Sequence, residues 1–163
     1  MEPKKEEKSM DKISKYWKYA KAEYKLLKVL GAGTFGQVVF GKHRVTKKEV
    51  AIKFIKGDLD SHQRIRNLIR ELSILRQLTA MKGNFFTTKL HDVILANKPD
   101  KPLKECKGLF LVLDYVPDDL KKMLDDISPG DFQEDHIKVI MYNILCSINF
   151  ISSANLMHRD IKP

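Results

Sequence analysis

The chain has 163 residues, of which 43% are hydrophobic and 31% charged, and its 30 Lys and Arg against 21 Asp and Glu give a formal charge of +9. This composition supplies enough apolar residues for a core and excludes a disordered polymer, and the length suits one domain. No stretch approaches the about 18 apolar residues of a membrane span, and residues 1–8 lack the apolar run of a secretory signal, so neither membrane spanning nor secretion is expected.

The first 22 residues alternate Lys with Glu or Asp around three aromatic residues, Tyr16, Trp17 and Tyr19. This alternation predicts an exposed, partly helical arm that lies outside the core. A basic patch for nucleic acid or lipid is the alternative. The interspersed acidic residues favour a solvated arm.

Three strands are expected next, at 24–30, 37–43 and 48–55, because each is rich in β-branched and aromatic residues. Their consecutive order predicts antiparallel pairing. A helix over 61–80 follows, with apolar residues at i, i+3, i+4 and i+7 and with Ser61 as its N-cap.

Two further strands are expected at 89–96 and 109–115, with a Lys- and Pro-rich loop between them. The second is apolar nearly throughout, which predicts burial on both faces. A short helix near 118–126, capped by Asp118, and a longer helix at 132–153 complete the chain. The longer helix has one apolar stripe, formed by Ile137, Ile140, Met141, Ile144, Leu145, Ile148 and Ile151.

The predicted order β-β-β-α-β-β-α-α indicates an α+β fold in two lobes. A mostly antiparallel five-stranded sheet with one helix forms the first lobe, and a helical region forms the second. The two cysteines, Cys106 and Cys146, have no metal-ligand spacing and are expected to be buried thiols in a reducing compartment.

Residues 31–38 read Gly-Ala-Gly-Thr-Phe-Gly-Gln-Val and match the pattern G-x-G-x-x-G-x-V. The pattern alone is weak, and a glycine turn that binds nothing is the alternative. In a dinucleotide-binding fold such glycines begin a helix, whereas β-branched and aromatic residues follow them here. The pattern therefore favours a hairpin whose backbone N–H groups approach phosphate oxygens.

Lys53 lies in the third strand on the same face as Ala51, since side chains alternate along a strand. A lysine among apolar residues needs a partner. Glu71, which borders the apolar stripe of the 61–80 helix, is the candidate, and the pair would hold the ammonium near phosphates at the glycine hairpin. The alternative is that Lys53 reaches solvent and Glu71 pairs with Arg66 or Arg70.

The chain ends in His-Arg-Asp-Ile-Lys-Pro, residues 158–163. In this segment Asp160 could accept a hydroxyl proton and Lys162 could neutralise a transferring phosphoryl group. Taken in order, the glycine pattern, Ala-Ile-Lys, the helical glutamate and His-Arg-Asp-x-Lys-Pro resemble the eukaryotic protein kinase family, from about Tyr24 to the last residue.

The resemblance implies a kinase that transfers the γ-phosphate of ATP to serine and threonine hydroxyls of proteins. Asp160 would be the catalytic base, and Lys162 points to the serine/threonine branch. Lys53 would contact the α- and β-phosphates and would be oriented by Glu71. Protein substrates and upstream kinases would be its partners, with no nucleic acid or membrane, in the cytoplasm, the nucleus or both.

The resemblance also implies the nucleotide-binding residues. The glycines would cover the phosphates, two small apolar residues would enclose adenine, and the backbone of 114–116 would bind the adenine edge after a gatekeeper residue. Asp119 would reach the ribose. The implied set is Leu30, Gly31, Ala32, Gly33, Thr34, Phe35, Gly36, Val38, Ala51, Lys53, Leu113 (the gatekeeper), Asp114, Val116 and Asp119.

Segments 70–78, 111–122 and 153–160 resemble mitogen-activated and cyclin-dependent kinases, the CMGC group, and slightly more the mitogen-activated side. The implied organisation has three parts. These are a charged N-terminal arm (1–22), a kinase N-lobe with the ATP-binding loop (23–115), and a hinge with a partial helical C-lobe that ends in the catalytic loop (116–163).

In the family, Mg²⁺ is bound by an Asn and a D-F-G Asp that follow the catalytic loop, so their positions lie beyond Pro163. No metal ligand is therefore assigned, and this chain alone is expected to transfer phosphate poorly. A non-catalytic nucleotide-binding or interaction module is the alternative. The apolar stripe of the 132–153 helix is expected to be partly bare and to favour association.

Overall fold

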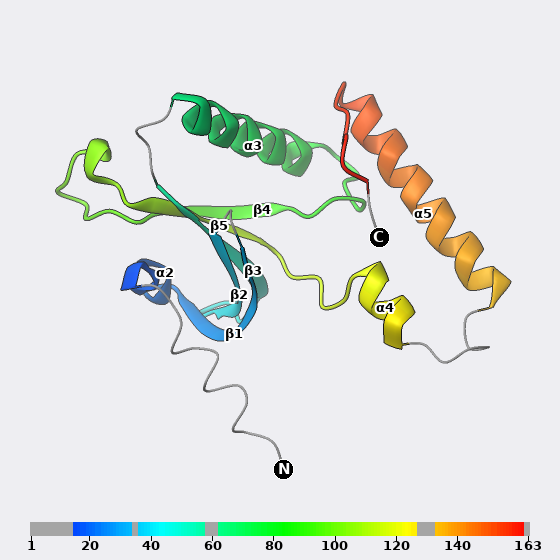
Figure 1. Ribbon diagram of the computed structural model, residues 1–163, viewed down its shortest axis with the longest axis horizontal. Helices are drawn as coiled ribbons and strands as arrows, with labels where there is room; N and C mark the ends of the chain where they lie inside the picture. Colours follow the sequence, from blue (N-terminus) through cyan, green and yellow to red (C-terminus); the bar gives the residue numbers. More distant parts are fainter. Residues whose placement is uncertain (1–14, 34–35, 58–61, 127–132, 162–163) are drawn as a thin grey trace, which may run out of the picture.

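A computed structural model describes residues 15–33, 36–57, 62–126 and 133–161 (Figure 1). Short helical turns precede the first strand, one longer helix runs beside the sheet, and two more helices follow the last strand (Figure 1). In chain order the elements are η1 (Lys15–Trp17), α2 (Lys18–Lys21), β1 (Tyr24–Gly33), β2 (Gly36–His43), β3 (Glu49–Lys56), α3 (His62–Ala80), β4 (Leu90–Leu95), η2 (Leu103–Glu105), β5 (Gly108–Asp114), α4 (Leu120–Asp126) and α5 (Glu134–Ser153).

The five strands form one sheet in the order β1-β2-β3-β5-β4, and every neighbouring pair is antiparallel. The predicted α+β class and the antiparallel pairing of the first three strands are therefore confirmed. β5 lies between β3 and β4, so its two sides are both hydrogen-bonded to neighbouring strands.

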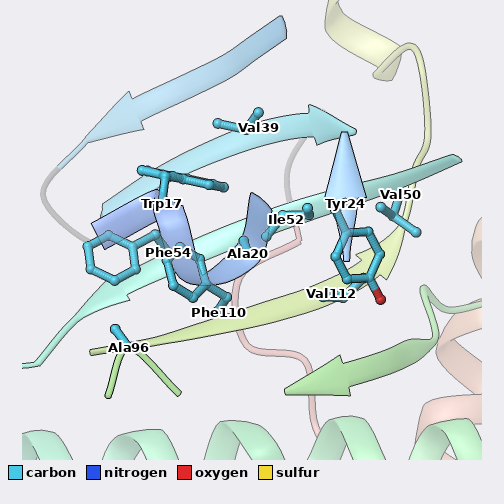
Figure 2. Close-up of a cluster of buried hydrophobic side chains, with 10 residues drawn as sticks. All are labelled: Trp17, Ala20, Tyr24, Val39, Val50, Ile52, Phe54, Ala96, Phe110 and Val112. Carbon is cyan, nitrogen blue, oxygen red and sulfur yellow. The ribbon is translucent and has the colours of Figure 1, made fainter. Parts of the chain in front are cut away.

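The main core lies on one face of this sheet (Figure 2). In β3, Val50, Ile52 and Phe54 are buried and face the core, whereas the alternate residues, Lys53 among them, are half-buried. The fully buried face of β3 is thus opposite to the face of Lys53. Every residue from Gly108 to Val112 in β5 is buried, as its continuous apolar run predicted.

The N-terminal segment covers this core face, so the expectation of an exposed arm was wrong for its described part. Trp17 is 1% exposed and Ala20 is 0% exposed. Trp17 and Ala20 are three residues apart in the helical segment formed by η1 and α2, so they lie on one side of it, against the sheet. The Trp17 ring packs edge-on against Phe110, with the ring centroids 5.0 Å apart. Residues 1–14 lie outside the described residues.

On the opposite face, α3 runs beside the sheet, so that α2 and α3 lie on different sides of it (Figure 1). Leu78 is the residue of α3 that is buried. The turn after α3 is organised by buried Asn84, whose amide nitrogen donates to the carbonyl oxygen of Leu78 over 2.7 Å and whose amide oxygen accepts the N–H of Thr87 over 3.1 Å.

The cap of α4 differs from the predicted one, and the structure also shows how α5 begins, for which no cap was predicted. For α4, the Asp119 carboxylate accepts the N–H of Lys122 over 2.7 Å, so Asp119 rather than Asp118 caps the first turn. Gln133 and His136 form a reciprocal capping box at the start of α5. The predicted cap of α3, Ser61, lies outside the described residues.

In α5, whose residues are all described, none is buried. Several members of its apolar stripe are exposed, among them Leu145 at 59%. The expectation that this stripe is partly bare is confirmed for the described chain. Of the two cysteines, Cys106 is buried as predicted, whereas Cys146 in α5 is only half-buried.

Candidate functional site

The glycine hairpin is formed by the ends of β1 and β2, where Gly33 pairs with Gly36. Gly36 has φ +127°, and a Cβ atom there would lie 1.8 Å from the carbonyl oxygen of Phe54. Only glycine fits that position, because both the backbone angle and the close approach exclude a side chain. A Cβ on Gly31 would meet nothing within 4 Å, so this side of β1 leaves room for a ligand. Thr34 and Phe35 lie outside the described residues.

Lys53 and Glu71 form an ion pair beside this hairpin. The Lys53 Nζ lies 2.6 Å from the Glu71 Oε1, and the two side chains are 28% and 40% exposed. The pair joins the middle of β3 to α3, as the sequence predicted, and it replaces the alternative pairing of Glu71 with Arg66 or Arg70. At this exposure the pair contributes less than about 1 kcal/mol to stability, so its main effect is to place the ammonium.

The register places the expected adenine-facing residues on the face of Lys53. Val38 pairs with Lys53 across β2 and β3, and Ala51 pairs with Leu113 across β3 and β5. Because paired residues point to the same face, all four lie on the side of the sheet opposite to the main core. Leu30, near the end of β1, is exposed.

An aromatic pair that the sequence reading missed lies beside this face. The rings of Phe40 and Tyr115 are 4.2 Å apart between centroids. Phe40 pairs with Ala51 and Tyr115 follows β5, so the two rings join the second strand to the segment that leads to α4. The alternation of Val38 and Phe40 along β2 was the pattern that could have placed Phe40 on this face.

Asp114, at the end of β5, is the centre of a polar cluster that the sequence did not predict. Its carboxylate accepts the backbone N–H of Lys89 over 2.8 Å and lies 2.5 Å from the His91 Nε2, while the Lys48 Nζ is 3.7 Å away. Its own N–H donates to the Lys89 carbonyl. The Asp114 N–H and carboxylate are thus both engaged within the protein.

Partial burial acts to raise the pKa of the Asp114 carboxyl. The hydrogen bond from the Lys89 N–H, the hydrogen bond and charge of His91 and the charge of Lys48 outweigh burial and lower that pKa below its ordinary value. Asp114 is therefore ionised at neutral pH.

The segment from β5 to α4 carries the two other expected contacts. Val116 is exposed. Asp119 is exposed and caps α4, while the neighbouring Asp118 accepts a hydrogen bond from the Lys122 Nζ over 2.5 Å. That hydrogen bond and the charge of Asp118 raise the pKa of Lys122.

The final segment follows α5 through two left-handed residues, Asn155 with φ 57° and Arg159 with φ 60°. Asp160 is exposed, and its N–H donates to the His158 Nδ1 over 3.3 Å. The Gln77 side chain of α3 donates to the Ala154 carbonyl over 3.3 Å, which connects the start of this segment to the helix that holds Glu71. Lys162 lies outside the described residues.

Within the described ranges, no group of three or more His, Cys, Asp or Glu side chains is placed to hold a metal ion. Over the same residues, no helix combines the length and the apolar character that crossing a membrane requires.

A glycine hairpin, a lysine paired with a helical glutamate and a five-stranded antiparallel sheet joined to helices together define a phosphate-binding, kinase-like class of protein. The protein kinase domain family model matches residues 24–163, so the chain belongs to the protein kinase family. Enzymes of this family use ATP and Mg²⁺ and act on protein substrates.

Proposed function

We propose that this chain is a serine/threonine protein kinase, of the mitogen-activated type, that binds ATP on the Lys53 face of its sheet. The observation that carries the proposal is the 2.6 Å pair between the Lys53 Nζ and the Glu71 Oε1, which lies beside a hairpin that requires glycine at position 36. In the protein kinase family, a pair of this kind between the sheet and the helix holds the lysine near the nucleotide phosphates.

Lys53 supplies the positive charge for the α- and β-phosphates in this proposal. Its ammonium is held by Glu71 before ligand binds, so little reorganisation is needed when the phosphates arrive. Gly31, Gly33 and Gly36 allow the hairpin backbone to approach the phosphates closely, and its N–H groups can donate to phosphate oxygens.

Adenine is proposed to lie against the apolar residues of the same face. Val38 and Ala51 enclose the ring, Leu113 limits the depth of the pocket, and Val116 provides backbone contacts to the adenine edge. Asp119 binds the ribose hydroxyls with whichever carboxylate oxygen does not cap α4. The register that puts Val38 and Ala51 on the Lys53 face supports this arrangement.

The transfer step is assigned to the final segment. Asp160 accepts the proton of the attacking hydroxyl, and Lys162 neutralises charge on the moving phosphoryl group. When bound, Mg²⁺ supplies further charge neutralisation on the phosphates. Because the family's Mg²⁺ ligands follow the catalytic loop, we expect the 163-residue chain by itself to bind nucleotide and to transfer phosphate slowly.

The finer assignments rest on sequence resemblance. Lys162 supports the serine/threonine type, and segments 70–78, 111–122 and 153–160 support the mitogen-activated type. Protein substrates and upstream kinases would be the partners, in the cytoplasm, the nucleus or both.

Titration with a fluorescent ATP analogue tests nucleotide binding. We expect Lys53→Met to weaken binding about tenfold or more, because a charge-assisted contact to phosphate is lost. Lys56→Met is the matched control, since Lys56 is an exposed lysine on the same strand. The affinity of this variant for the ATP analogue should stay within about twofold of that of the wild type. Absence of binding by the wild type, or equal loss in both variants, would contradict the proposal.

A radiolabelled-ATP assay tests the expectation of slow transfer. Kinase-like turnover by the purified chain that disappears in Lys53→Met would show that the 163 residues are catalytically sufficient. Nucleotide binding with no detectable transfer agrees with our expectation.

A further inference from the structure

The N-terminal segment, formed by η1 and α2, touches the glycine hairpin through one side-chain hydrogen bond. The indole Nε1 of Trp17 donates to the Gln37 Oε1 over 2.9 Å in a partly buried position. Gln37 directly follows Gly36, the last glycine of the hairpin. A residue outside the nucleotide face is thus bonded to the base of the loop that would cover the phosphates.

Gln37 is the second residue of β2, at the base of the hairpin, and lies between β1 and β3. It pairs with Ala32 in β1 and with Phe54 in β3, so its position affects both neighbouring strands. The Phe54 ring also contacts the Trp17 ring, with 6.2 Å between centroids (Figure 2). The indole therefore contacts β2 through a hydrogen bond and β3 through ring packing.

The close approach at Gly36 makes this base sensitive to small shifts. The Gly36 backbone already lies against the Phe54 carbonyl, as the 1.8 Å distance of a hypothetical Cβ shows. β2 thus has backbone contact with β3 at residue 36 and a side-chain link to Trp17 at residue 37. Close-packed groups of this kind occupy discrete positions, so loss of the link is expected to loosen the hairpin base locally.

The hydrogen bond is also needed by the indole itself. Trp17 is 1% exposed, and a buried indole N–H requires an acceptor. That acceptor is a side chain of the glycine hairpin, so the N-terminal segment and the hairpin stabilise each other.

We propose that Trp17 is a positioning residue for the glycine hairpin: through Gln37 it fixes the start of β2 and so raises the affinity for nucleotide phosphates. This inference rests on the proposed function and extends its site to the N-terminal segment on the opposite face of the sheet. A partner or modification that displaced Trp17 would lower nucleotide affinity without touching the site.

Two loss variants and one rescue variant test this inference. Trp17→Phe keeps aromatic packing and removes the donor, Gln37→Met keeps length and removes the acceptor, and Gln37→Glu retains an acceptor oxygen. Gln63→Met is the matched control, because Gln63 is an exposed residue of α3 whose amide nitrogen donates to the Asn67 Oδ1 over 3.1 Å.

The first readout is hydrogen exchange of amides 36–39 without nucleotide. We expect these amides to exchange about threefold to tenfold faster in each loss variant, because that factor corresponds to the loss of one hydrogen bond. The double variant that carries both loss substitutions should exchange no faster than either single variant. Gln37→Glu and Gln63→Met should stay within about twofold of the wild type. Unchanged exchange at 36–39, or an equal increase over the whole chain, would overturn the inference.

The second readout is affinity for the fluorescent ATP analogue. We expect each loss variant to bind about threefold to tenfold more weakly and Gln63→Met to bind like the wild type. Local exchange that accelerates without loss of affinity would also overturn the inference. If the wild type binds no nucleotide, the proposed function fails by itself, and the exchange result still decides whether Trp17 positions the hairpin.

Discussion

The sheet and its N-terminal segment bury their large apolar side chains, whereas helix α5 leaves several of its apolar side chains exposed. On the core face, Trp17, Ile52 and Phe110 are almost fully buried against one another. α5 contains no buried residue, and its links to the rest of the described chain include only a few contacts, such as Phe86 with Phe150 at 5.9 Å between ring centroids.

The difference shows that an amphipathic pattern predicts a helix without naming its partner. The apolar stripe of α5 is regular enough to specify a helix, yet the described chain covers it only in part. The N-terminal segment has a weaker pattern and many charges, yet a single tryptophan anchors it in the core. Burial in this molecule therefore depends on where large side chains lie in the fold, and the length of an apolar stripe does not predict it.

The largest expected effect is that of Trp17→Ala, which removes the largest fully buried side chain. We expect it to lower the free energy of unfolding by about 3–5 kcal/mol, through lost burial and a cavity. In contrast, Leu145→Ala in exposed α5 should change it by less than about 0.5 kcal/mol. Urea unfolding of the two variants measures both values, and equal destabilisation would break the contrast between the two regions.

Gly36→Ala and Gly31→Ala form a matched pair within the sheet. We expect Gly36→Ala to destabilise by about 2–4 kcal/mol, because its Cβ would collide with the Phe54 carbonyl at an unfavourable φ. Gly31→Ala should cost less than about 1 kcal/mol, since its Cβ enters open space. Thermal unfolding checks both, and a neutral Gly36→Ala would disprove the close approach.

Asp114→Asn should have a smaller effect that depends on pH. The lowered pKa of Asp114 means that its stabilisation is present above the ordinary value of 3.8 and is lost as pH falls through the lower folded value. We expect a loss of about 1 kcal/mol at pH 7 that disappears near the folded pKa. Unfolding curves measured between pH 7 and pH 2 test this, and a constant difference would exclude the carboxylate as its source.

Leu145→Glu should have the smallest effect on stability, within about 0.5 kcal/mol, because Leu145 is exposed. It should nevertheless reduce self-association, since a charge interrupts the bare apolar stripe. Sedimentation or size-exclusion chromatography over a range of concentrations checks this. A wild type that stays monomeric throughout would show that the exposed stripe does not drive association.

Local pattern was sufficient for most of the sheet and for the central ion pair. Runs of β-branched, aromatic and other apolar residues predicted the strands within a few residues. A lysine in an apolar strand required a carboxylate partner, which proved to be Glu71. The strands depend on residues that are neighbours in sequence, and the ion pair depends on one lysine that needs one carboxylate. Both features can therefore be predicted from residue types.

The missed features depend on contacts between distant segments. The cluster around Asp114 joins β5 to Lys48, the residue before β3, and to His91 in β4, and no local pattern marks it. The burial of Trp17 was missed because the alternating charges of residues 1–22 predict an exposed arm. The available signal was the spacing of Trp17 and Ala20, which puts two apolar residues on one side of a helical turn.

The order of strands also determines how the chain must fold. β1, β2 and β3 pair in sequence, and so do β4 and β5, but β3 meets β5 only after α3 and β4 have been made. That junction holds Ile52, Phe54, Phe110 and Val112, four residues of the core. During synthesis β3 therefore has an unpaired edge until β5 has emerged, and closing this long-range contact is the step expected to limit the folding rate.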